Sequence, residues 1–386
     1  MIETPEDGAR EIVLANAEVV TPEEVVRGRV VVVRGRIVAV EEGSGGGHLD
    51  LNGDLLIPGL IDLHTDSLEK HIQPRSGVQW DPVAAALSHD LQIAGSGITT
   101  VFDSLTVGAA ETWDSRDDLL EPMIDGLLRT TRHGMLRAEH FVHLRCEVTH
   151  PDIVALVERL IEGELVRFLS VMDHAPGDRQ VPDVEVYRRL IAPRMKNNDR
   201  AMSAHVDQLI RASRTIGPAN RRAVAALANA RGLPLASHDD ARPAHIEEAA
   251  ALGVQVTEFP TTVEAAAAAR TSGLKILMGA PNLLRGTSHS GNVAAGTLAE
   301  RGLVDIFASD YVPASMLHAA FALSRPPFDL PLPQAIACVT EQPAAAAGLT
   351  DRGVIAPGKR ADLVHVRMVE GWPVVRAVWR EGSRIV

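Results

Sequence analysis

The sequence predicts an α/β protein: a (β/α)8 barrel, with a small β-sandwich domain formed from both chain ends. The first observation behind this prediction is a series of eight short apolar runs between about residues 60 and 350, each followed by a helical, often Ala-rich stretch. Eight such repeats fit a barrel of this type, for which roughly 250 residues is typical. The second observation is that both ends of the chain contain only short strand-like runs.

The terminal segments resemble each other in pattern. Short alternating or β-branched runs bounded by Gly and Pro predict strands at residues 11–20, 29–41, 54–58, 360–368, 374–380 and 383–386. Because the two ends share this pattern, we expect them to share one sheet. The predicted small domain therefore comprises residues 1–58 and 355–386, and the barrel comprises residues 59–354 with a helical insertion at about 178–230.

The eight barrel strands are predicted from apolar runs that mostly end in a charged or imidazole side chain. They lie at residues 60–66, 97–104, 140–148, 168–174, 233–239, 254–260, 274–280 and 304–310. An open doubly wound sheet has the same alternation of strands and helices. However, no G-x-G-x-x-G turn follows the first strand, so the nucleotide-binding form of that fold lacks its phosphate loop.

Composition narrows the class of partner. The 386 residues include 38 Lys and Arg against 50 Asp and Glu, a formal net charge of −12, and only 13 aromatic residues (7 Phe, 4 Trp and 2 Tyr). This balance argues against a nucleic-acid partner. No apolar run is long enough to span a bilayer and the first residues do not resemble a signal peptide, so no membrane partner is expected. Two cysteines, at 146 and 338, fit a reducing compartment, and we expect a cytoplasmic homo-oligomer.

Polar residues at the ends of the predicted strands point to a metal centre. The carboxyl ends of barrel strands form one face, so these side chains should meet there. His64 and Asp66 are two residues apart on an extended segment and therefore point to the same side. Imidazole and carboxylate ligands suit zinc, manganese or iron, and a second ion would need a bridging carboxylate such as Glu147. The predicted ligands are His64, Asp66, Glu147, His174, His238 and Asp310.

The segments IPGLIDLHTD (57–66) and GVIAPGKRADLVHV (353–366), with the spaced His, Glu and Asp set, resemble the amidohydrolase superfamily. The resemblance implies a metal-dependent hydrolase with one or two divalent ions, most often Zn²⁺ or Mn²⁺. It also implies that Glu147 is the bridging ligand, and that Asp310 takes a proton from the attacking water and passes it to the leaving group. Asp66 stands where this family usually has a second His, which leaves the number of ions open.

A narrower set of motifs resembles the PhnM family of phosphonate metabolism, in the carbon–phosphorus lyase pathway. It comprises LHTDSLEKHIQPR, HLRCEVTHP, VMDHAPG, GAPNLLRGTSHSGN and ASDYVP. The resemblance implies hydrolysis of α-D-ribose 1-methylphosphonate 5-triphosphate to the 5-phosphate and pyrophosphate, by attack of metal-bound hydroxide on phosphorus. It is also compatible with association with other phosphonate-pathway proteins.

Cationic and hydroxyl residues near two strand ends are candidate phosphate ligands, since a late loop of the barrel often binds phosphate. Backbone N–H groups in the Gly- and Ser-rich loop after the seventh strand could also form an anion nest. The candidates are Lys70, His71, Arg75, Arg285, Ser288, His289, Ser290 and Asn292. Lys70 and Arg75 fit a solvated helix face equally well.

Two other functions remain compatible with the sequence. One is an amidohydrolase that acts on a C–N bond, such as a cyclic amidase or an N-acetyl-sugar deacetylase, because the metal centre alone does not distinguish the substrates. The other is a non-catalytic scaffold of the same fold. The sequence also leaves open the roles of four further polar residues: Asp173, His205, Asp239 and Glu258.

Overall fold

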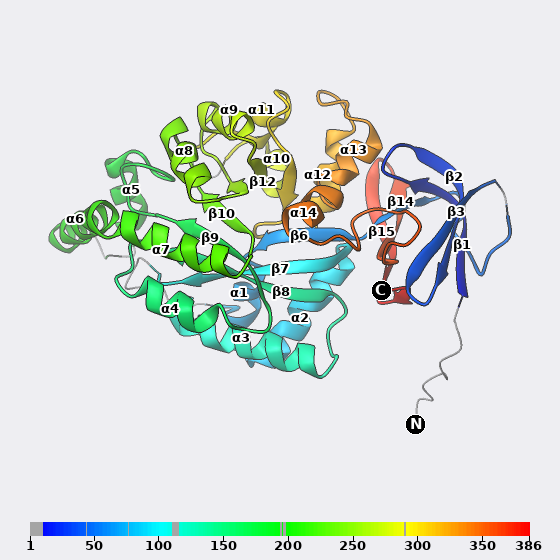
Figure 1. Cartoon of the computed structure of the whole chain (residues 1–386), viewed down its shortest axis with the longest axis horizontal. Coiled ribbons are helices and arrows are strands. Elements are labelled where there is room, and N and C mark those ends of the chain that lie inside the picture. The colour runs from blue at the N-terminus through cyan, green and yellow to red at the C-terminus, as the bar shows by residue number, and fades with distance from the viewer. Residues whose placement is uncertain are drawn as a thin grey trace.

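The computed structural model describes residues 11–43, 45–75, 77–109, 116–193, 195, 198–288 and 291–386. Two eight-stranded sheets dominate it, and Figure 1 shows them side by side, with helices packed around the one that carries most of the chain. No helix among these residues combines the length and apolarity needed to cross a membrane.

The larger sheet is the predicted barrel, and all eight predicted strands are present in sequential order. They are β6 (Leu60–Thr65), β7 (Ile98–Val107), β8 (Glu139–Glu147), β9 (Val166–Met172), β10 (Leu235–His238), β11 (Val256–Glu258), β12 (Lys275–Gly279) and β13 (Ile306–Ala308). Every neighbouring pair is parallel. The strand order never reverses, as it would at the switch point of an open doubly wound sheet, so that alternative is wrong.

The barrel closes between its first and last strands. The backbone N–H of Asp310 donates to the carbonyl of His64 at 2.9 Å, and the N–H of Asp66 donates back to the carbonyl of Asp310 at 2.6 Å. A parallel bridge between Thr65 and Asp310 marks the same contact. Closure therefore brings the ends of β6 and β13 together, although about 245 residues separate them along the chain.

Apolar side chains fill the barrel interior below the strand ends. Phe102, Phe168 and Leu277 are fully buried within one cluster that draws on seven strands. A second, larger cluster packs the outer faces of the strands against the surrounding helices. Because the interior is filled with side chains, the barrel is not a pore, and its carboxyl-terminal mouth is where barrels of this type bind ligands.

Helices follow most of the barrel strands. They are α1 (Ser67–Ile72), α2 (Pro82–Gly95), α3 (Arg116–Arg132), α4 (Ile153–Leu160), α5 (Val184–Ile191), α6 (Asp199–Thr215), α7 (Gly217–Ala230), α8 (Pro243–Ala251), α9 (Val263–Thr271), α10 (Ala280–Arg285), α11 (Ala295–Ala299), α12 (Ser315–Leu323), α13 (Leu332–Ala337) and α14 (Glu341–Ala346). The stretch predicted as a helical insertion contains α5, α6 and α7. A small core of its own joins α5 to α6, including Tyr187, Ile191, Met202 and Val206.

The second sheet combines both chain ends, as predicted. Its strands are β1 (Glu11–Val20), β2 (Val25–Val33), β3 (Arg36–Glu42), β4 (Leu49–Asp50), β5 (Leu55–Pro58), β14 (Leu363–Val369), β15 (Trp372–Arg380) and β16 (Ser383–Arg384). β5 lies between β1 and β14 and so joins the two ends, and a separate hydrophobic core, with Leu56 and Trp379, belongs to this sheet. The strand predicted at 29–41 is instead parts of two strands, because the chain turns at Arg34 and Gly35, which both have positive φ.

A network of buried histidines and carboxylates joins α2 to the outer side of the barrel. Asp103 of β7 contacts Nε2 of His89 at 2.6 Å and Nδ1 of His140 at 2.8 Å, while Nε2 of His140 lies 3.4 Å from Asp90. All four side chains are buried. Burial alone lowers the pKa of His140, but Asp103 and Asp90 outweigh that effect and raise it to about 9.

This network predicts that the protein loses stability in mildly alkaline solution. The raised pKa of His140 contributes stability that is complete below its ordinary pKa of 6.5 and is lost as the pH rises through about 9. Between those values the free energy of unfolding should fall by about 3 kcal/mol through this group. Urea unfolding at several pH values should show a smaller fall in His140→Gln. Equal falls in the two proteins would contradict the prediction. Because the other ionisable groups are the same in both proteins, their contributions to the pH dependence cancel in the comparison.

Candidate metal centre

A cavity of about 810 Å³ opens at the carboxyl ends of the barrel strands. Its wall includes all six side chains predicted as metal ligands, namely His64, Asp66, Glu147, His174, His238 and Asp310. They come from the ends of five different strands, so only the closed barrel brings them together. Their hydrogen-bond partners differ, and these partners indicate which side chains could bind a metal.

Two of the histidines are each held by a buried glutamate. Nδ1 of His174 lies 2.9 Å from Oε2 of Glu147, and Nδ1 of His64 lies 3.1 Å from Oε1 of Glu258. Thr149 donates its hydroxyl to the other oxygen of Glu147 at 2.7 Å. A carboxylate at Nδ1 orients the imidazole and presents Nε2 to a metal. Glu147 and Glu258 therefore act on the two histidines in equivalent ways.

These contacts keep Glu147 ionised. Burial would raise its pKa, but the hydrogen bond and charge of His174 and the hydrogen bonds of Thr149 outweigh burial and hold the pKa below its ordinary value. Glu258 is ionised for a similar reason, since His64 and His143 offset the effect of burial on its pKa. Both carboxylates can thus strengthen the electron-donating character of their histidines.

One set of donors in the cavity that could hold a metal consists of His174, His238 and Asp239. One ligand atom from each lies within 4.8 Å of the others. Nδ1 of His238 and Oδ2 of Asp239 are buried 3.4 Å apart, and within the described part of the chain neither atom has a hydrogen-bond partner. Nε2 of His174 lies 3.7 Å from the same carboxylate oxygen. Two imidazoles and one carboxylate match a site for zinc or manganese.

Two aspartates at strand ends have unusual backbone conformations. Asp239 has φ +56° and Asp310 has φ +55°, in the left-handed region that non-glycine residues seldom occupy. Asp239 directs its carboxylate toward the two histidines, and burial raises its pKa to about 6. Asp310 lies at the closure of the barrel and lines the cavity. Strained conformations of this kind are typical of functional sites.

Arg145 is the main site residue that the sequence interpretation missed. Its Nη1 donates to both oxygens of Asp66, at 2.9 and 3.2 Å, and its Nη2 lies 3.0 Å from Nε2 of His238. The alternation of side chains along a strand could have identified it, because Arg145 precedes Glu147 by two residues and therefore shares its face. Asp66 is thus paired with a cation and lies 3.8 Å from Nε2 of His64.

The predicted phosphate ligands separate into three groups. Arg285, Ser288 and Asn292 line the cavity, and Arg285 donates to the hydroxyl of Tyr311 at 3.2 Å. Lys70 lies outside the cavity wall, where its ammonium donates to the carbonyl of Tyr311 at 2.8 Å. Two further candidates are also absent from the wall. The ring of His71 contacts Gln92, and the backbone of Arg75 forms an isolated antiparallel β-bridge with Val78. The last two, His289 and Ser290, fall outside the described residues.

The insertion contributes apolar side chains to another part of the wall. Val186, Tyr187, Leu190 and Ile191 of α5 face the same cavity as the metal cluster. His205, whose role the sequence left open, lies on α6 and is not part of the wall. The cavity therefore has polar side chains at the strand ends and apolar side chains where α5 lines it.

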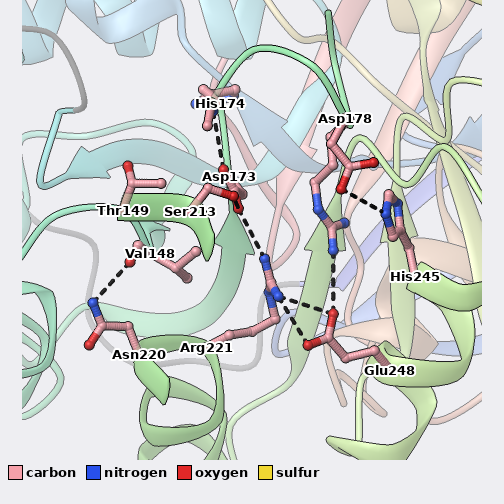
Figure 2. Close-up of polar contacts among 12 residues, drawn as sticks. Val148, Thr149, Asp173, His174, Asp178, Ser213, Asn220, Arg221, His245 and Glu248 are labelled. Carbon is pink, nitrogen blue, oxygen red and sulfur yellow. Dashed lines mark hydrogen bonds and ion pairs between the residues drawn. The ribbon is translucent and has the colours of Figure 1, made fainter. Parts of the chain in front are cut away.

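A polar network behind the site fixes the insertion to the strand ends (Figure 2). Arg221 of α7 reaches Asp173 at 3.4 Å and both oxygens of Glu248 at 3.0 Å, and Ser213 of α6 donates to Asp173 at 2.7 Å. Asn220 donates to the carbonyl of Val148 at 2.9 Å. Asp173 precedes the ligand candidate His174, so it holds that loop in place from outside the cavity.

Comparison with known proteins identifies the family. A model of the amidohydrolase family matches residues 195–383. A curated protein of Escherichia coli (strain K12), α-D-ribose 1-methylphosphonate 5-triphosphate diphosphatase, is 44% identical over 378 residues, which cover 97% of this chain and all of that protein.

Solved structures share the fold at low sequence identity. N-acetyl-D-glucosamine-6-phosphate deacetylase from Mycobacterium smegmatis, as a D267A mutant with its sugar phosphate, matches with a TM-score of 0.61 and 18% identity over 98% of this chain and 100% of that one. 5-Methylcytosine deaminase from Klebsiella pneumoniae matches with a TM-score of 0.65 and 15% identity over 97% and 98%. From the 44% identity across its length, the chain belongs to the amidohydrolase superfamily and, within it, to the family of the Escherichia coli diphosphatase.

Proposed function

We propose that the protein hydrolyses α-D-ribose 1-methylphosphonate 5-triphosphate to the 5-phosphate and pyrophosphate, in the catabolism of phosphonates. One observation carries the proposal: a single cavity combines a donor cluster suited to a divalent metal with two arginines, Arg145 and Arg285. A triphosphate needs both features, because metal ions and guanidinium groups neutralise phosphoryl oxygens. The 44% identity to the diphosphatase over nearly the whole chain supports the same substrate.

The metal would be held by His174, His238 and Asp239, with Glu147 orienting His174 through Nδ1. A divalent ion at such a site supplies Lewis acidity toward phosphoryl oxygens and lowers the pKa of water at neutral pH. Zn²⁺ and Mn²⁺ are the ions that we propose, on the basis of the two imidazoles and one carboxylate.

The other residues bind the substrate and move a proton. In the proposed reaction water attacks phosphorus, the bond to the bridging oxygen breaks, and pyrophosphate leaves. Asp310 takes the proton of the attacking water and returns it to the leaving oxygen. Arg285, with Ser288 and Asn292, contacts the terminal phosphates at the exposed side of the cavity. The apolar side chains of α5 line another part of the cavity wall.

The test is the release of pyrophosphate by purified, metal-loaded protein. We expect pyrophosphate and not orthophosphate from the phosphonate triphosphate. Nucleoside triphosphates, assayed in parallel, measure whether the protein also recognises the ribose 1-methylphosphonate part of the substrate. N-acetylglucosamine 6-phosphate should yield no acetate. Release of acetate without pyrophosphate would instead assign the protein to C–N bond hydrolysis, and no product from any of these substrates would overturn the proposal.

Its setting in the cell is also a proposal. The two cysteines, Cys146 and Cys338, are buried and unbridged, which fits the cytoplasm. The homo-oligomer and the association with other phosphonate-pathway proteins stay predictions, to be measured by sedimentation and by co-purification of the native protein.

A further inference from the structure

Arg145 is the buried arginine of the cavity wall, and the proposed function gives it only a general share in neutralising phosphoryl charge. The side chain of Arg145 is 6% exposed, yet it lines the cavity wall and contacts His238. Arginine stays protonated in proteins, so this buried side chain carries a full positive charge, which its contact with Asp66 partly balances. Burying a charged guanidinium lowers the stability of the fold unless an oppositely charged group or ligand interacts with it.

The contacts of Arg145 leave part of the guanidinium without a protein partner. Nη1 and Nη2 contact Asp66 and His238, whereas Nε is buried and has no hydrogen-bond acceptor among the described residues. Guanidinium groups typically bind phosphate with two N–H groups at once. The unpartnered N–H and the position in the wall therefore point to an anionic ligand.

The surrounding charges favour the same conclusion. Carboxylates from Asp66, Glu147, Asp239 and Asp310 line the cavity, and Arg285, on the exposed side, is the other arginine in its wall. A polyphosphate that approaches the strand ends would meet net negative charge without a cation at the floor. Arg145 supplies that cation beside the metal cluster, while Arg285 supplies one at the entrance.

We propose that Arg145 binds a phosphoryl oxygen of the substrate at the floor of the cavity, and that Asp66 is the counter-ion that positions Arg145 and is not a metal ligand. The assignment of a phosphorylated ligand rests on the proposed function. The pairing of Asp66 with Arg145 rests on two hydrogen bonds and changes the ligand set expected from the sequence.

The first experiment measures pyrophosphate binding to the metal-loaded protein by calorimetry, with the metal content determined again after the titration. Arg145→Gln should bind pyrophosphate at least about tenfold more weakly than the unaltered protein, and Arg145→Lys should lie between them, because lysine keeps the charge but loses the planar fork. Arg352→Gln is the matched control, since Arg352 is a buried arginine paired with Glu139 away from the cavity. Equal affinity in Arg145→Gln, or an equal loss in Arg352→Gln, would overturn the proposal.

The second experiment measures bound metal by elemental analysis and needs no substrate. Asp66→Asn should retain the metal content of the unaltered protein, while His174→Asn should lose most of it. Near-ultraviolet circular dichroism of both variants verifies the fold, and Asp66→Glu provides a second variant if Asp66→Asn does not fold. Metal loss in a folded Asp66 variant that equals the loss in His174→Asn would show that Asp66 is a ligand.

The two proposals fail separately. If the phosphonate triphosphate yields no pyrophosphate but Arg145→Gln weakens pyrophosphate binding, the proposed function is wrong and the role of Arg145 stands. If hydrolysis occurs and pyrophosphate binding is insensitive to Arg145, the function stands and Arg145 has a different role.

Discussion

Replacing Asp310 by asparagine is expected to lower kcat for pyrophosphate release by about 1000-fold, with little change in KM. General acid–base catalysis contributes typically 10²–10⁴-fold, and an amide cannot accept the proton of the attacking water. Asparagine tolerates the left-handed backbone of this position almost as well as aspartate does, so the barrel closure should survive. Steady-state kinetics at saturating metal provide the measurement.

Asp329 supplies a matched control for this substitution. It has φ +50° and is exposed, and it does not line the cavity. Asp329→Asn therefore makes the same chemical change in the same backbone conformation and should leave kcat unaltered. If Asp310→Asn keeps more than a tenth of the activity while its metal content is normal, Asp310 is not the proton carrier. Loss of metal in that variant would assign Asp310 to the ligand set that the sequence also suggested.

Removal of the metal is expected to abolish hydrolysis. Substitution of Asp239 should weaken metal binding, so that more added metal is needed to restore the activity. Dialysis against a chelator should lower the rate by at least about 100-fold, and added Zn²⁺ or Mn²⁺ should restore it, because three donors, two of them buried, converge at the cluster. Asp239→Asn removes the negative oxygen that lies near both histidines. Its metal affinity, measured by competition with a chromophoric chelator, should fall by about 10- to 100-fold.

His133→Asn is the control for the histidine variants of the cluster. His133 is exposed after the end of α3 and contacts only a backbone carbonyl, that of Arg129, among the hydrogen bonds of its side chain in the described structure. This variant should bind metal as the unaltered protein does. Full activity after exhaustive chelation, or unchanged metal affinity in Asp239→Asn, would contradict a metal centre at this place.

Much of the barrel follows from local sequence. Each strand is an apolar run, most of the runs end in or just before a polar residue, and each is followed by a segment with helical character, so the order of elements is predictable from neighbouring residues. The turn at Arg34 and Gly35 shows the limit of this approach, because the β-branched residues on both sides of it were interpreted as one strand although they form a hairpin. The short strand β4 was missed since two residues carry too little pattern.

The candidate site was predictable as a set of positions but not as a set of pairs. His64 and Glu258 are 194 residues apart, and Arg145 and Asp66 are 79 apart, yet each pair is in hydrogen-bond contact. Nothing local to Asp66 distinguishes a metal ligand from a counter-ion of arginine. For Arg75, which bridges to Val78, the sequence equally could not tell a phosphate ligand from an exposed residue.

The sequence by itself determined the succession of eight strands, the shared sheet of the two chain ends, and the polar residues that would face one another at the mouth of the barrel. The tertiary structure alone decided which carboxylate serves which histidine, that Arg145 stands among them, and that α5 covers the cavity with apolar side chains. The physical reason is range. Strands and helices form from contacts a few residues apart, whereas hydrogen bonds of about 3 Å across a closed barrel depend on every strand being in register.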